Sequence, residues 1–283
     1  MVEKLKKELG LLDVFCIATG AMISSGLFIL PGMAFAKAGP GVVFSYLLAG
    51  LLCIPTLLSM AELSTAMPKA GGDYFYIMRG FGPLLGTVAG FSTWFSLGLK
   101  SAFALIGVGV YLSVVIRLPM NFIALAFCLF FIVLNLTGVK EAGRVQVFLV
   151  IGLLCILGAY ILLALGRVNS ANFSPFFPRG ITPVFSTASF VFISYAGLVK
   201  ITALAEEIKD PGRNIPLGMI ISLAVVSILY AAAIFVTVGV MAPENLKNSL
   251  TPISDGAFIA GGNFLKAVVS LGALLSFITT ANA

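Results

Sequence analysis

The stretch Gly20-Ala21-Met22-Ile23-Ser24-Ser25-Gly26-Leu27-Phe28 decides the fold. It lies inside an apolar run over residues 12–37, which is long enough to cross a membrane because a transmembrane helix needs about 20 mostly apolar residues. Ser24, Ser25 and Gly26 are poor helix formers and have apolar sequence on both sides. The stretch therefore predicts a transmembrane helix that is interrupted near its middle.

The composition of the whole chain also indicates a membrane protein. Of its 283 residues, 60% are hydrophobic and 10% are charged, whereas soluble domains carry roughly 25% charged residues. A water-soluble globule of this size has too little interior to bury so much apolar side chain. Because the apolar runs are too long for barrel strands and lack their alternation, we predict an all-α integral membrane protein.

Eight apolar stretches are long enough to be transmembrane helices. They cover about residues 12–37, 41–66, 82–115, 120–138, 145–166, 183–206, 215–241 and 256–283. The third stretch is long enough to be strongly tilted or to project beyond the bilayer. No Ala-x-Ala cleavage site follows the first stretch, so we expect a span and no removable signal peptide.

Basic residues alternate between the loops on the two sides of these spans. With the N-terminus in the cytoplasm, the cytoplasmic side has the larger group: Lys4, Lys6, Lys7, Lys69, Arg79, Lys140, Arg144, Lys209 and Arg213. The opposite side has Lys37, Arg117, Arg167, Arg179 and Lys247. The pattern favours a multi-pass protein of the cytoplasmic membrane with a cytoplasmic N-terminus. It accounts for the net charge of +6 without a nucleic-acid partner.

The residue content argues against an enzyme or a metal protein. The sequence has no histidine, which excludes histidine bases, catalytic triads and histidine-ligated metals. The four cysteines form no CxxC pair and lie inside apolar runs, so we expect no disulfide framework. No acid and nucleophile are paired at the depth of the interruption. We therefore expect no catalytic residue, no organic cofactor and no resident metal.

The sixth span has a similar interruption at Ile193-Ser194-Tyr195-Ala196-Gly197-Leu198-Val199-Lys200. Non-helical backbone at membrane depth is tolerated only where it is buried in protein or lines a wet cavity. For Gly26 or Gly197 alone, close helix packing is the simpler explanation. Corresponding interruptions in two halves of a chain instead indicate the substrate site of a transporter.

Three motifs resemble the amino acid–polyamine–organocation (APC) superfamily of permeases. The first is the stretch Gly20 to Phe28, which resembles the break in that family's first helix. Ala61-Glu62-Leu63, followed by Pro68-Lys69-Ala70-Gly71-Gly72-Asp73-Tyr74, resembles the end of its second helix and the next loop. The most specific is Glu206-Glu207-Ile208-Lys209-Asp210-Pro211-Gly212-Arg213-Asn214-Ile215-Pro216, which resembles the signature after the sixth helix.

The resemblance runs over the whole chain and implies the leucine-transporter fold. In that fold two inverted repeats of five helices surround the substrate, and helices one and six are unwound beside it. Residues 1–166 would then be the first repeat of a single transmembrane domain, and residues 183–283 an incomplete second repeat with helices six to eight. Since the family needs at least ten spans, we expect a fragment or a truncated gene product.

The resemblance also implies which residues hold the substrate. In helix one the substrate carboxylate would bind the backbone of Ile23, Ser24, Ser25 and Gly26. In helix six the α-amino group would bind carbonyls of Ile193, Ser194, Ala196 and Gly197. Ile193 and Tyr195 would wall the side-chain pocket, although for Tyr195 simple aromatic packing is an equal alternative.

Lys100 and Lys200 are ionisable residues inside apolar spans. Such residues are costly unless they face a cavity or a partner, so each is a candidate functional residue. The resemblance places Lys100 at a substrate-facing position of helix three, and Lys200 follows the second interruption. Each lysine could exchange the coupling proton or pair with an acidic substrate side chain. The alternative is a structural ammonium group held by carbonyls.

Sodium is the alternative coupling ion. Some family members carry a lysine on helix five in place of sodium, and the span 145–166 has none. A sodium site would then use carbonyls near Gly20 and Ala21 with hydroxyls of Ser276, Thr279 or Thr280. Hydrogen bonds to the preceding helical turn explain these hydroxyls more simply.

The resemblance implies a secondary active transporter of amino acids or related amines, driven by protons or sodium or working by exchange. The buried lysines, with no carboxylate at mid-membrane, argue against cationic amino acids and polyamines. The alternative is a sensor with the same fold that binds an amino acid without moving it.

Overall fold

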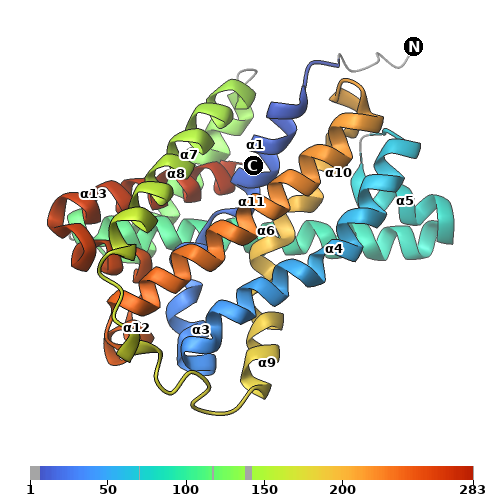
Figure 1. Cartoon of the computed structure of the whole chain (residues 1–283). Coiled ribbons are helices and arrows are strands. Elements are labelled where there is room, and N and C mark those ends of the chain that lie inside the picture. Colours follow the sequence, from blue (N-terminus) through green and yellow to red (C-terminus); the bar gives the residue numbers. More distant parts are fainter. Residues whose placement is uncertain (1–6, 70, 117, 138–141, 283) are drawn as a thin grey trace.

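The computed structural model describes residues 7–69, 71–116, 118–137 and 142–282. Over these ranges the backbone forms helices and no strand, as expected for an all-α membrane protein (Figure 1). Lys4, Lys6, Arg117 and Lys140 of the basic-residue pattern lie outside the described residues.

The first part of the chain forms helices up to residue 165. They are α1 (Leu11–Met22), α2 (Ser25–Phe28), α3 (Leu30–Ala38), α4 (Val42–Ala66), α5 (Gly72–Phe81), α6 (Pro83–Ile116), α7 (Met120–Thr137) and α8 (Ala142–Leu165), with a 3₁₀ turn at Gly39–Gly41. After a 3₁₀ turn at Ser170–Phe173 come α9 (Thr182–Val191), the 3₁₀ helix η3 (Phe192–Val199), α10 (Lys200–Ala203), the 3₁₀ turn Ala205–Glu207, α11 (Pro211–Val240), α12 (Pro243–Asn248) and α13 (Pro252–Asn282).

Within the part of the chain that the structure describes, six helical stretches are long and apolar enough to cross a membrane. They are Leu30–Ala66, Pro83–Ser113, Gln146–Leu165, Thr182–Ala203, Pro211–Val240 and Pro252–Thr280. Two shorter apolar helices, Leu11–Met22 and Met120–Phe130, occupy the positions of the first and fourth predicted spans. The first predicted span is no single long helix because the chain leaves the helical conformation at Ile23 and Ser24.

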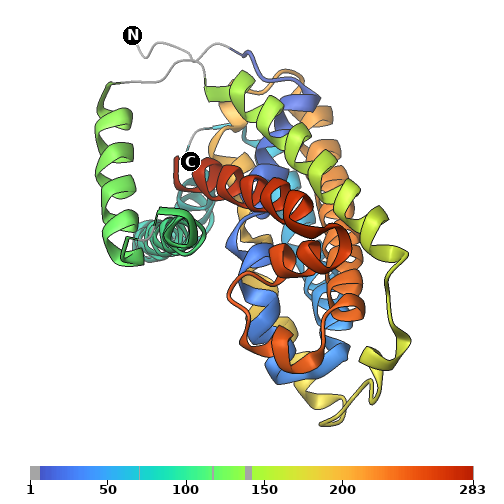
Figure 2. The ribbon, with the colours of Figure 1, turned by 90° about the vertical axis from the view of Figure 1, so that its left-hand side faces the viewer.

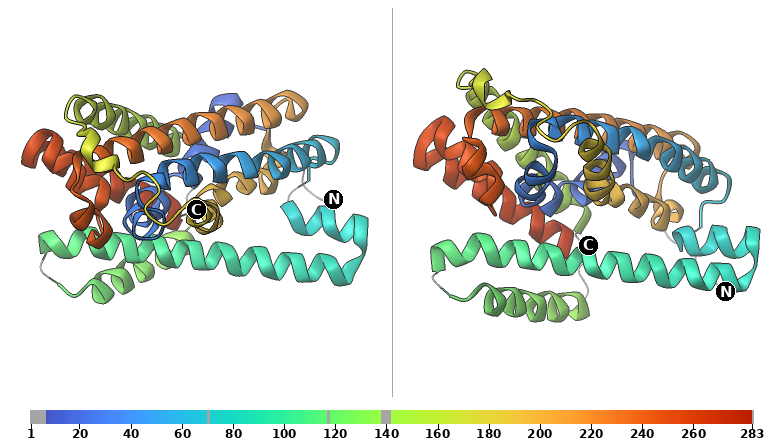
Figure 3. Two further views of the ribbon diagram at one scale, coloured as in Figure 1. Left: turned by 60° about the horizontal axis from the view of Figure 1, so that its bottom comes forward. Right: turned by 90° about the horizontal axis from the view of Figure 1, so that it is seen from below.

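The bundle is built around α1. This helix packs against α8, α11 and η3, and α11 in turn lies beside α4 (Figure 1). The long helix α6 runs along one side, with α5 folded back on its first turns and α7 on its last (Figures 2 and 3). The second half of α13 packs against both α6 and α8. Residues from distant parts of the sequence therefore meet around the end of α1.

The last predicted span, about 256–283, corresponds to α13, Pro252–Asn282. Helix α13 is bent at Gly261 and Gly262, and Gly262 has a φ of +72° that favours glycine. Asp255 before the bend accepts hydrogen bonds from Ser249 (2.6 Å), and its other carboxylate oxygen pairs with Lys266 after the bend (3.0 Å). The apolar pattern continues across this bend, which is why the sequence alone does not reveal it.

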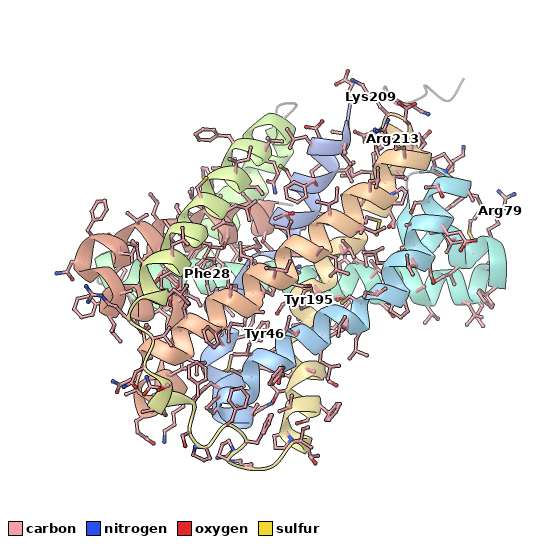
Figure 4. All side chains as sticks on the ribbon, viewed as in Figure 1. Phe28, Tyr46, Arg79, Tyr195, Lys209 and Arg213 are labelled. Carbon is pink, nitrogen blue, oxygen red and sulfur yellow. The ribbon has the colours of Figure 1, made fainter. Side chains whose placement is uncertain are left out.

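Basic residues gather at both ends of the bundle, as the loop pattern predicts. Lys209, Arg213 and Arg79 lie on the side where α1 begins (Figure 4). The opposite end is formed by α3, α12 and the loop before α9, which carry Lys37, Lys247 and Arg179 (Figure 1).

Candidate functional site

The first predicted interruption lies between α1 and α2. Helix α1 ends at Met22, Ile23 has extended dihedral angles (φ −74°, ψ 104°), and Ser24 is also non-helical (φ −156°, ψ −139°) before α2 starts at Ser25. The last carbonyls of α1 therefore have no amide donors from a following helical turn. All three residues are buried, so these groups need partners from other helices.

The segment predicted to be unwound in the sixth span has a different form. Residues Phe192–Val199 form the 3₁₀ helix η3, which joins α9 directly to α10. A 3₁₀ helix keeps its backbone hydrogen bonds and rises further per residue than an α-helix. The structure therefore does not confirm open backbone at Ile193 to Lys200: residues up to Val199 lie in a 3₁₀ helix, and Lys200 begins α10.

The two segments touch each other through glycine. A side chain at Gly197 would collide with the carbonyl group of Ala21 and would lie 2.6 Å from the amide nitrogen of Met22. A side chain at Gly26 would likewise collide with the side chain of Ser194. Glycine at 197 and at 26 thus lets η3 approach the end of α1 and the start of α2 at backbone distance.

Tyrosine hydroxyls bind the carbonyls that the interruption leaves free. Tyr230 of α11 donates to the carbonyl of Met22 (2.8 Å), and Tyr46 of α4 donates to that of Gly26 (2.7 Å). Tyr195 of η3 donates to the carbonyl of Tyr46 (3.0 Å). The rings of Tyr46 and Tyr195 pack edge-on against Tyr230, and Figure 4 shows Tyr46 and Tyr195 within the bundle.

Tyr46 and Tyr230 were not among the predicted site residues. Their signal in the sequence is a tyrosine inside an otherwise apolar span, which needs a partner for its hydroxyl. That signal gives no indication of the partner, because Tyr230 and Met22 are 208 positions apart.

Lys100 of α6 also contacts the end of α1. Its ammonium nitrogen donates to the carbonyl oxygen of Ala21 at 2.6 Å. Beside this contact is a cavity of about 50 Å³, lined by Ala21, Leu97, Lys100, Ser101, Gly197, Lys200 and Thr280. The structure thus brings both predicted lysines together with the contact between α1 and η3.

The other predicted substrate residues have several environments. Ile23, Ser24 and Ser25 are buried, and Ser194 is buried with no hydrogen-bond partner for its hydroxyl among the described residues. Ala196 is half-buried. Ile193 is 46% exposed, so its side chain faces outward and forms no wall of an enclosed pocket in this conformation. The hydroxyl of Tyr195 donates to the carbonyl of Tyr46.

Most of the residues considered for sodium are engaged in other contacts, whereas the hydroxyl of Thr280 has no hydrogen-bond partner among the described residues. Ser276 donates to the carbonyl of Ala273 and Thr279 to that of Ser276, each at 2.9 Å, which is the bond to the preceding turn. Gly20 packs against Gln146, and the carbonyl of Ala21 accepts the hydrogen bond from Lys100. Across the part of the chain that is described, no three His, Cys, Asp or Glu side chains gather to hold a metal ion.

One carboxylate outside the membrane-crossing stretches has a shifted pKa. Asp73 lies in the first turn of α5 and accepts a hydrogen bond from Thr93 of α6 (3.4 Å). Burial raises the pKa of Asp73 above its ordinary value, and the bond from Thr93 lowers it by less. Asp73 therefore links α5 to α6 at the end of the bundle where Arg79 lies (Figure 4).

Comparisons with known proteins agree with this architecture. The model of the family described as amino acid permease matches residues 9–283. The branched-chain amino acid permease BcaP of Bacillus subtilis is 31% identical over 98% of this chain. The methylthioribose transporter of the same organism is 29% identical over 98% of this chain. BcaP of Lactococcus lactis is 31% identical over 93% of it.

The chain spans less than two thirds of the length of these relatives. It covers 64% of each of the two Bacillus subtilis proteins and 62% of the Lactococcus lactis protein. All three are named as permeases or transporters, and none is named as an enzyme.

Proposed function

The chain belongs to the amino acid permease family, and from this premise we propose that it is a secondary active transporter of amino acids. It is a multi-pass membrane protein. We propose further that it lies in the cytoplasmic membrane with its N-terminus in the cytoplasm, with residues 1–166 as the first helical repeat and residues 183–283 as part of the second.

The contact between the two interrupted segments carries this proposal. Gly197 lies against Ala21 and Met22, and Gly26 lies against Ser194, so the residues proposed to bind the substrate come from both segments at one place. Backbone groups of Ile23, Ser24, Ser25 and Gly26 would bind the substrate carboxylate. Those of Ile193, Ser194, Ala196 and Gly197 would bind its α-amino group, with Tyr195 beside them.

The closed packing of this region fits an alternating-access cycle. The segment from Ile23 to Gly26 is buried, and the neighbouring cavity of about 50 Å³ is small for a whole amino acid. A substrate would therefore enter only after α1 and η3 move apart. The glycine contacts favour such a movement, because no interlocked side chain joins Gly197 to Ala21.

Proton coupling is proposed for Lys100, with Lys200 as its neighbour in the cavity. The Lys100 ammonium group holds a carbonyl of the interrupted helix, so loss of its proton would remove a charged donor from that helix end. The Ala21 carbonyl was also a candidate sodium ligand, and a sodium ion there would have to displace Lys100. This arrangement favours protons over sodium as the coupling ion.

The test is uptake of radiolabelled amino acids into proteoliposomes that contain the protein. The panel includes branched-chain, other neutral, acidic and cationic amino acids, each under an imposed proton gradient, an imposed sodium gradient or exchange conditions. Uptake driven by the proton gradient supports the proposal. Binding of an amino acid without uptake under any condition would instead support the alternative function, a sensor with the same fold.

A further inference from the structure

The cavity between Lys100 and Lys200 holds more positive charge than its lining can balance. Among the described residues that line it are two lysines, one from α6 and one from α10, and no carboxylate. Lys100 is held by the carbonyl of Ala21. Lys200 takes part in none of the hydrogen bonds and ion pairs that lysines make with the described residues. An ammonium group without a partner is costly within a membrane protein.

The same cavity contains a hydrogen-bond donor with no acceptor. Thr280 of α13 is 5% exposed, and its hydroxyl has no partner among the described residues. A buried hydroxyl without a partner destabilises the folded state. Thr280 lies on a different helix from either lysine. Hydrogen-bond donors from α6, α10 and α13 therefore line the same cavity.

The size of the cavity limits what these donors can bind. Its volume is about 50 Å³, and about 15 Å³ of such volume holds one water-sized group. A halide with a water molecule fits this space, and so does a single carboxylate group. A phosphate ester or a whole amino acid is too large.

We propose that the cavity binds a small monovalent anion between Lys200, Lys100 and the hydroxyl of Thr280. Such an anion carries one negative charge and has lone pairs that accept hydrogen bonds from ammonium and hydroxyl groups. The anion has two sources, a halide from solution or the side-chain carboxylate of an acidic substrate. Only the second source rests on the proposed transport function.

Thermal unfolding of the purified chain in lipid nanodiscs tests anion binding without transport. Sodium chloride and sodium acetate are each compared, at equal ionic strength, with sodium gluconate, whose anion is too bulky for the cavity. A ligand of the folded state raises Tm saturably, and we expect a rise of roughly 2–5 °C with chloride and acetate. The rise should be lost in Lys200→Met and retained in Lys209→Met, which removes an exposed lysine at the end of the bundle.

Radiolabelled chloride provides a measurement that does not depend on the folding of a variant. We expect saturable binding to the wild-type chain. Displacement by aspartate and not by leucine assigns the site to an acidic substrate, and displacement by neither assigns it to the halide. Equal Tm in chloride, acetate and gluconate, or a chloride response in Lys200→Met equal to that of the wild type, would overturn the proposal.

The outcomes for the anion and for transport are independent. Gradient-driven uptake without chloride or acetate binding would refute the anion site alone. Anion binding without uptake of any amino acid would refute the proposed transport and leave the anion site standing.

Discussion

The ammonium nitrogen of Lys100 lies 2.6 Å from the carbonyl oxygen of Ala21, which joins the middle of α6 to the last turn of α1. The bond is made one residue before the helix ends at Met22. Tyr230 of α11 donates to the carbonyl of Met22 itself. The end of α1 is therefore held by a cation and a hydroxyl from two helices, and each contact makes a separate prediction.

Replacement of Gly197 by alanine should separate η3 from α1. The added methyl group would collide with the carbonyl of Ala21, and overpacking of this kind costs about 1–3 kcal/mol. We expect a lower Tm in detergent and weaker binding of the substrate. Gly152→Ala in α8 is the matched control, because nothing lies within 4 Å of an added methyl group there. Equal Tm values for the two variants would contradict the close contact.

Replacement of Tyr230 by phenylalanine should destabilise the end of α1. The variant keeps the ring that packs on Tyr46 and Tyr195 but leaves the buried carbonyl of Met22 without its donor. We expect a loss of about 1–3 kcal/mol, measured by thermal unfolding. Tyr74→Phe, at an exposed position of α5, serves as the control. If both variants unfold at the same temperature, the hydroxyl of Tyr230 has no structural role.

Asp73 should make stability depend on pH. Its pKa is raised in the folded protein by burial, so the folded state binds a proton more tightly than the unfolded chain does. Stability should therefore fall as pH rises from the ordinary aspartate pKa, near 3.8, through the raised one. Asp73→Asn should lack this fall while it keeps a polar side chain near Thr93. Parallel pH profiles of Tm for the wild type and the variant would show that the carboxylate is well solvated.

The fold could be predicted where a local pattern determines the backbone. Ser24, Ser25 and Gly26 indicate an interruption because poor helix formers follow one another inside an apolar run, and the helix does end at Met22. The same kind of pattern around Gly197 corresponds to a 3₁₀ helix. Small residues permit both forms, and the choice depends on how closely α1 approaches. The bend at Gly261 and Gly262 was missed because apolar residues continue on both sides of it.

The sequence predicts which charged residues belong to the candidate site but not which groups they bind by hydrogen bonds. A lysine in an apolar span indicates that a partner or cavity exists, which is how Lys100 and Lys200 were identified. The identity of the partner depends on tertiary packing. Ala21 lies 79 positions from Lys100, and nothing in either local sequence relates the two. The role of Ile193 in a pocket wall stays a prediction, because its side chain is 46% exposed in this conformation and its direction depends on the 3₁₀ turn.

The most direct test of the account compares wild type with Lys100→Ala in proteoliposomes under an imposed proton gradient, with substrate binding measured in parallel. Lys209→Ala, which removes an exposed lysine, is the control for the loss of charge. The account predicts that uptake by Lys100→Ala falls to the level of empty liposomes while the variant still binds the substrate. Uptake by Lys100→Ala equal to that of the wild type would contradict it and would leave Lys100 as a structural donor to the carbonyl of Ala21.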